Sequence, residues 1–105
     1  MVNKILTAAG VRGRRGRFTG NRPSTYVVWM DDITTDGPDG FPRVLRHDVT
    51  LELYEDKPDD KAEAAIEAAI AAEGLQYAKQ DLYWIQSEQM YQVIYEITYY
   101  EKRRI

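Results

Sequence analysis

The sequence contains no cysteine and only one histidine, His47. Because cysteine is missing, disulfides and cysteine-ligated zinc sites are excluded, and the chain needs no oxidising compartment to fold. His47 falls in a predicted strand, and no turn motif marks a serine or cysteine nucleophile, so no catalytic triad can be proposed. We therefore expect a protein that is not an enzyme and that holds no cofactor and no metal ion.

Long hydrophobic runs are also lacking. The most apolar stretch, residues 62–72, is mostly alanine and is interrupted by Glu63 and Glu67, whereas a membrane-spanning helix needs about 20 apolar residues. Residues 1–10 show no charged region followed by a long apolar run, so they do not resemble a signal peptide. These features predict a soluble protein that acts in a reducing cytoplasm, or in an assembly made there, without membrane contact.

The composition is that of one folded domain, but the charge is unevenly distributed. The 105 residues are 44% hydrophobic and 30% charged, which argues against disorder and predicts a single domain over residues 1–105. The net charge of −3 becomes −8 when five clustered arginines are removed. These are Arg12, Arg14, Arg15, Arg17 and Arg22. The protein is therefore acidic except for one basic segment, and that segment could bind an anionic partner such as a nucleic acid or an acidic protein surface.

The N-terminal half is predicted to contain one helix and two strands. Residues 3–9 place Ile5, Leu6 and Ala9 at helical spacing, and Gly10 follows as a helix stop. Residues 11–23 are rich in glycine and arginine without periodicity, which predicts a mobile loop. Residues 24–30 predict a strand and residues 31–42 a loop, because the latter carry aspartate, glycine and proline. Residues 43–54 alternate apolar and polar side chains and predict the second strand of a hairpin.

The C-terminal half is predicted to contain a second helix and two more strands. Asp60 and Glu63 can form a capping box, Asp59 also suits the positive end of a helix, and Gly74 ends it. Residues 75–87 and 90–100 predict the third and fourth strands. The element order is thus α-β-β-α-β-β. We expect an α+β fold in which a mainly antiparallel four-stranded sheet carries its helices on one face.

Four aspartates occupy the predicted loop at residues 31–42. They are Asp31, Asp32, Asp36 and Asp39. If an EF-hand calcium loop began at Asp32, its third, fifth and sixth positions would hold acceptable residues. Its twelfth position must be a bidentate glutamate, but that position is Arg43. The flanking elements are strands rather than helices. We therefore interpret these residues as a solvated loop that contacts another protein, and not as a calcium site.

The arginine segment at residues 12–17 has two interpretations that stay open. Flexible arginines reach phosphates, and the glycines between them let the backbone approach a nucleic acid. Alternatively, the loop becomes ordered against an acidic neighbouring subunit. DNA contact is the less favoured of the two, because Phe18 is the only aromatic residue close by in the sequence that bases would stack on.

Aromatic residues crowd the predicted last hairpin. They are Tyr83, Trp84, Tyr91, Tyr95, Tyr99 and Tyr100. Alternation places Tyr91, Tyr95 and Tyr99 on one face of the fourth strand, together with Val93 and Ile97. One face is expected to be core, and the aromatic side chains beyond it suit either a large core or a protein interface.

Several segments resemble small structural proteins encoded in the head–tail joining region of siphophages and prophages. One segment is the Leu-Glu-Leu-Tyr-Glu-Asp-Lys strand end at residues 51–57, and a second is the acidic-capped helix at residues 59–73 closed by Gly74. A third comprises Tyr77, Lys79, residues 84–88 and the Met-Tyr-Gln-Val-Ile-Tyr-Glu run at residues 90–96. The strand at residues 26–28 and the N-terminal helix fit as well. Together the segments cover most of the chain.

This resemblance implies a tail completion or tail terminator protein. Copies of such a protein form a ring, typically sixfold, that caps the tail tube and docks it to the head connector. The implied partners are therefore further copies of the chain, the tail tube protein and head–tail connector proteins. The implied locations are the host bacterial cytoplasm during assembly and then the neck of the virion. The segment at residues 12–17 is more basic than the family pattern, so a nucleic-acid-binding module remains the alternative function.

Overall fold

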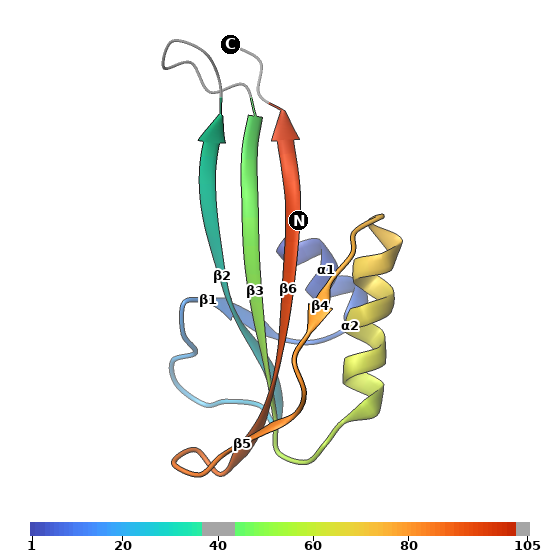
Figure 1. The fold of residues 1–105 in the computed structure, drawn as a ribbon. Coiled ribbons are helices and arrows are strands. Elements are labelled where there is room, and N and C mark those ends of the chain that lie inside the picture. Colours follow the sequence, from blue (N-terminus) through green and yellow to red (C-terminus); the bar gives the residue numbers. More distant parts are fainter. Residues whose placement is uncertain (37–43, 103–105) are drawn as a thin grey trace.

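The computed structural model describes residues 1–36 and 44–102, which form two helices and a six-stranded sheet (Figure 1). The helices are α1 (Val2–Ala9) and α2 (Asp60–Ala72). The strands are β1 (Gly13–Arg15), β2 (Thr25–Asp36), β3 (Val44–Glu55), β4 (Ala78–Lys79), β5 (Tyr83–Ile85) and β6 (Met90–Lys102). Among the described residues, neither helix has the length and the apolar character that a membrane-spanning segment needs.

Three long antiparallel strands form the centre of the sheet. The strand order is β1-β2-β3-β6-β4, and β5 also pairs with β6. In the register, Leu51 of β3 lies between Trp29 of β2 and Tyr95 of β6, so these three side chains share one face. The short β1 is parallel to β2, because the chain returns through residues 16–24 before β2 begins.

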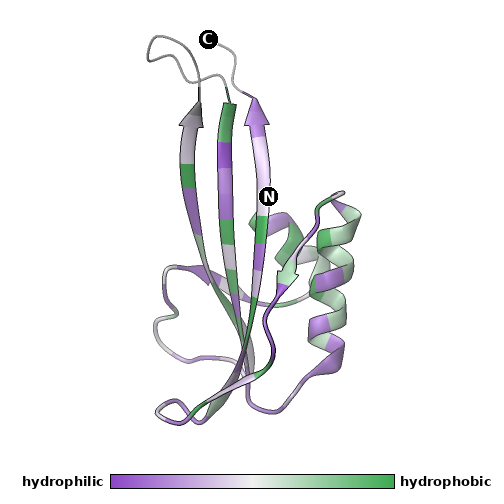
Figure 2. Ribbon diagram, in the orientation of Figure 1, coloured by the Kyte–Doolittle hydropathy of each residue, from purple (hydrophilic) through white to green (hydrophobic). Residues whose placement is uncertain are grey.

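The core lies between one face of this sheet and both helices. Val27, Leu51, Leu53 and Tyr95 are fully buried on that face and pack with the apolar sides of α1 and α2. The other members of the core are Val2, Ile5, Leu6, Val49, Ile66, Ala69, Ile70, Val93 and Ile97. Figure 2 shows the alternation along β3, where apolar and polar segments follow one another. The expected alternation of β3 and β6 is thus confirmed, and residues of both helices share the core with this face of the sheet.

Both helices end where their sequence directs, although one cap differs from expectation. Gly10 adopts φ of 72° and its N–H faces the last carbonyls of α1, a left-handed conformation that glycine takes without strain. Asp59, rather than Asp60, is the N-cap of α2 and accepts a 3.0 Å hydrogen bond from the Ala62 N–H. The expected capping box is therefore wrong, because Glu63 points instead to Lys79.

The α+β class is confirmed, whereas the strand count and two loops need correction. Residues 11–23 are not a loop throughout, because residues 13–15 add β1 to the sheet. Residues 31–36 continue β2, because each of them pairs with β3, and the rest of the expected loop lies outside the described residues. The expected third strand is divided into β4 and β5. Between them, Leu82 donates its N–H to the Asp81 carboxylate at 2.8 Å and not to a neighbouring strand.

The three long strands extend well beyond the helices. We call their far ends, residues 31–36 of β2, 44–49 of β3 and 97–102 of β6, the distal arm. The distal arm gives the molecule an elongated shape of 49 × 27 × 23 Å (Figure 1). Apart from Val49 and Ile97, which belong to the core at its base, the distal arm lies beyond the helices. Among the described residues its two outer strands keep unpaired backbone groups along their edges.

Candidate interaction surfaces

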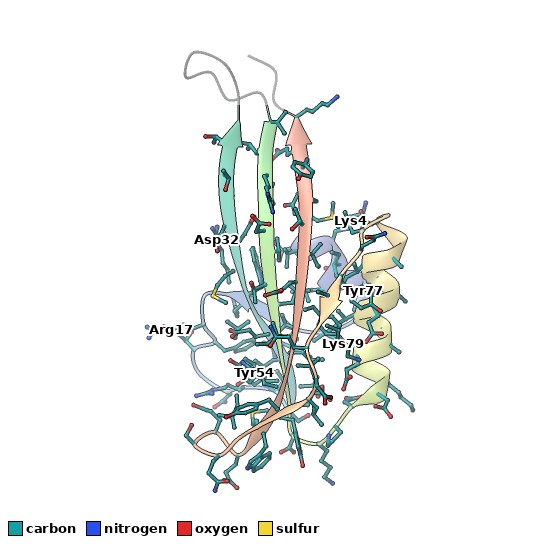
Figure 3. The ribbon with its side chains drawn as sticks, in the orientation of Figure 1. Lys4, Arg17, Asp32, Tyr54, Tyr77 and Lys79 are labelled. Atoms are coloured by element: carbon teal, nitrogen blue, oxygen red, sulfur yellow. The ribbon has the colours of Figure 1, made fainter. Side chains whose placement is uncertain are left out.

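The predicted arginine segment forms a solvent-exposed patch at one edge of the sheet. Arg12 and Arg14 both lie over the ring of Phe18, with their guanidinium carbons 5.9 and 5.8 Å from its centre. Arg15 lies 5.6 Å from the ring of Trp29, and Figure 3 shows Arg17 directed away from the sheet. We call these four residues the arginine patch. Within the described residues none of the four makes an ion pair, so the patch presents uncompensated positive charge.

Arg22 is separate from the arginine patch. Its guanidinium donates to Glu88 at 3.1 Å and to the Tyr26 hydroxyl at 3.3 Å. The Arg22–Glu88 ion pair joins the segment after β1 to the turn before β6. Both residues line a hollow of about 520 Å³ on the sheet face opposite the helices. The hollow is also lined by Arg17, by Phe18 and by Tyr54, whose ring stacks on that of Tyr26. Arg22 therefore has a structural role that its place in the sequence cluster did not reveal.

The predicted acidic loop residues belong mainly to the edge strand. Asp31, Asp32 and Asp36 lie in the distal half of β2, and Asp39 lies outside the described residues. Asp32 is exposed and lies on the same face as its register partner Asp48 of β3. Asp31 is instead nearly buried, because its carboxylate contacts His47. Asp31, Asp32 and Asp36 therefore lie in a strand rather than in a loop, and Asp31 makes an internal contact with His47.

His47 links the three strands of the distal arm. Its Nδ1 lies 2.8 Å from Asp31 Oδ2 on β2, and its Nε2 lies 3.0 Å from Glu101 Oε1 on β6. His47 is 6% exposed, and its ring stacks on Tyr99 with the ring centres 4.3 Å apart. A neutral imidazole has only one N–H, so hydrogen bonds to two carboxylates require the doubly protonated ring.

The charge of His47 follows from a balance of opposing effects. Burial is the largest single effect and lowers the pKa of His47, but the hydrogen bonds and charges of Asp31 and Glu101 outweigh it, so the pKa is raised. Both ring nitrogens are occupied, which leaves no free nitrogen to act as a catalytic base in this state. The sequence showed an isolated strand histidine, and the partners that define its role lie on two other strands.

A second polar cluster attaches α2 to the sheet. Lys79 of β4 contacts Glu63 at 2.9 Å and Glu67 at 2.8 Å, and Glu67 also accepts a 2.7 Å hydrogen bond from the Tyr95 hydroxyl (Figure 3). The two glutamates raise the pKa of Lys79, so it stays charged. Within the described parts of the chain, no three histidine or carboxylate side chains form a set that holds a metal ion.

Comparisons with known proteins give a structural relative but no sequence family. No family model and no curated protein matches the sequence. Among solved structures, the chain is similar to one from "Virion of native gene transfer agent (GTA) particle", with a TM-score of 0.59 at 14% sequence identity. The match covers 90% of this chain and 81% of that chain. At this level of identity the likeness shows a shared fold.

Proposed function

We propose that this protein is a non-catalytic structural component of a phage-like virion. In this role it acts at the head–tail junction, as a tail terminator or tail completion protein. Copies of it form a ring, sixfold by expectation, on the end of the tail tube and join the tube to the head connector. Assembly takes place in the host cytoplasm, and the mature location is the neck of the particle.

The observation that carries this proposal is the fold likeness to a virion chain over 90% of the sequence. It agrees with the resemblance to head–tail joining proteins in segments spread along the chain. The geometry is also suitable, since the distal arm is a three-stranded antiparallel sheet that projects beyond the helices. Projecting sheets with open edges are suited to assembly with neighbouring subunits.

The proposal is tested by inactivating the gene in the phage or prophage that encodes it. We expect electron microscopy of the lysate to show filled heads and separate tails. Adding the purified protein to that lysate should restore joined, infectious particles. Joined particles in normal numbers without the protein would contradict a head–tail role.

The arginine patch supports a second candidate function, a nucleic-acid-binding module. Arg12, Arg14 and Arg15 are fixed above aromatic rings, and no carboxylate among the described residues neutralises them. Exposed guanidinium groups of this kind bind phosphates, and each phosphate contact adds to the salt dependence of binding. The aromatic faces are occupied by the arginines themselves, so backbone contact is favoured over base stacking.

The two functions are separated by titrating the isolated protein with duplex DNA at several salt concentrations. The module predicts affinity that falls steeply with salt and is abolished by the Arg14→Ala/Arg15→Ala double variant with the fold intact. The junction function predicts weak binding that this variant hardly changes. A variant of Lys61, an exposed cation on α2, serves as the control for general charge effects.

A further inference from the structure

The distal arm has two open edges, one on each side. Within the described residues, β1 pairs with β2 only from Val27 to Trp29, so β2 has no neighbour on its outer side beyond that point. On the opposite side, among the residues that the structure describes, β4 and β5 pair with β6 only as far as Glu96, so residues 97–102 have no paired strand on their outer side. Open strands of this length are templates for pairing with another strand.

We propose that neighbouring copies in the ring join by pairing the outer edge of β2 of one copy with the outer edge of β6 of the next. The occupant of each open edge is thus a second copy of this chain. The inference rests on the proposed ring and specifies its subunit contact. Because subunits of a ring share one orientation, and β2 and β6 run in the same direction, the new pair is parallel (Figure 1).

The residues that direct their backbone N–H and C=O groups outward at the two edges are positioned to bond each other in this pairing. Val27 donates its N–H to β1 and Trp29 accepts from Gly16, so odd-numbered residues of β2 direct their backbone groups outward. Ile94 accepts from Gln80, so even-numbered residues of β6 direct theirs outward. In a parallel pair, an outward residue bonds the two residues that flank its partner. Ile33 therefore bonds Thr98 and Tyr100 when it lies beside Tyr99.

In the same register, the paired residues lie at the same level along the strands and on the same face of the sheet. Within one protomer Ile33 and Tyr99 both lie level with His47, so rotation without axial shift brings Ile33 beside Tyr99 of the next copy. Both residues are on the face that carries the helices. Thr34 then lies beside Tyr100 on the opposite face, and the sheet continues from copy to copy with its two faces preserved.

Both edges expose apolar side chains. The β2 edge exposes Ile33 to 50% and the β6 edge exposes Tyr100 to 65%, and pairing covers apolar surface at both.

A cysteine pair tests the contact directly, because the natural chain has no cysteine. The variant is Thr34→Cys/Tyr100→Cys, at two exposed positions. Within one protomer these positions flank Arg46 of β3 and are separated by two strand spacings, about 9.5 Å. That exceeds the reach of a disulfide, about 7 Å between Cα atoms. Oxidation therefore links only different copies, and we expect a ladder of covalent oligomers ending at the closed ring.

The matched control is Thr34→Cys/Glu96→Cys, which has the same face and strands but lies four residues away from the proposed partner. It should give no ladder. A second test pair, Asp32→Cys/Thr98→Cys, has the same geometry and replaces the first if the Tyr100 variant does not fold. Native mass spectrometry of each reduced variant reports the oligomeric state. A ring that does not cross-link at either test pair overturns this contact and leaves the proposed function standing, whereas a protein that stays monomeric at every concentration, both alone and with isolated tail tubes, overturns both.

Discussion

Glu55 is a completely buried carboxyl at the end of β3, and its neutral replacement should stabilise the protein at alkaline pH. The side chain is 0% exposed and accepts the Asp59 N–H at the start of α2. Its other oxygen, Oε1, has no hydrogen-bond partner among the described residues. Burial, followed by the nearby Glu63 carboxylate, raises the pKa of Glu55 from 4.5 to about 7. A group that binds its proton more tightly in the folded state stabilises that state below the unfolded pKa and loses this contribution as the pH rises through the folded one.

The size of the effect follows from that rise in pKa. A change from 4.5 to about 7 corresponds to about 3 kcal/mol, most of which disappears between pH 5 and pH 8. Glu55→Gln keeps the shape of the side chain and can accept the Asp59 N–H, but it does not titrate. We expect the variant to be close to the wild type in free energy of unfolding at pH 5 and about 2.5 kcal/mol more stable at pH 8. For a domain of this size that is a rise in Tm of roughly 10 °C or more.

Urea unfolding at both pH values, followed by circular dichroism, measures the difference. Glu96→Gln, which removes an exposed carboxylate of β6, is the control and should show no such pH dependence. If the difference in unfolding free energy between Glu55→Gln and the wild type is the same at pH 5 and pH 8, the assignment of a buried, protonated carboxyl at this position is refuted.

Three further variants test the local structure. His47→Ala leaves two carboxylates of the distal arm without their cation and should cost about 3–5 kcal/mol in unfolding free energy at pH 6. Because the pKa of His47 is raised, the loss should shrink as the pH rises above that pKa, and a pH-independent loss would argue against a charged ring. Gly13→Ala places a Cβ against a buried leucine side chain of α1 and should cost about 1–3 kcal/mol; a gain in Tm would show that this packing is loose. Asp59→Ala removes the N-cap of α2 and should cost about 1 kcal/mol, whereas the neighbouring Asp60→Ala should cost less, and equal losses would contradict the cap assignment.

The regular parts of the fold could be predicted from local patterns. Alternation in β3 and β6 identified Val49, Leu51 and Leu53, and likewise Val93 and Ile97, as one buried face, because side chains in a strand point alternately to the two sides of the sheet. Helix stops at glycine were equally local. These signals lie within a few neighbouring residues, so the sequence alone contains them.

The parts that were wrong depend on contacts between distant segments. Asp31, Asp32 and Asp36 favour turns by propensity, yet pairing with β3 keeps them in a strand, and His47 compensates the charge of Asp31. The three residues of β1 are too few to show a period. The role of His47 depends on residues 16 and 54 positions away in the chain, which no local pattern reveals. Arg22 belongs to the sequence cluster of arginines but pairs with Glu88, 66 positions away.

The most direct test of the proposed function is the mass of the purified protein by native mass spectrometry over a wide range of concentration, alone and with isolated tail tubes. We predict one discrete closed oligomer of the 12.2 kDa chain, a hexamer by expectation, which forms alone or on the tube ends. A protein that stays monomeric in both settings, and leaves the tube ends bare, would contradict the account.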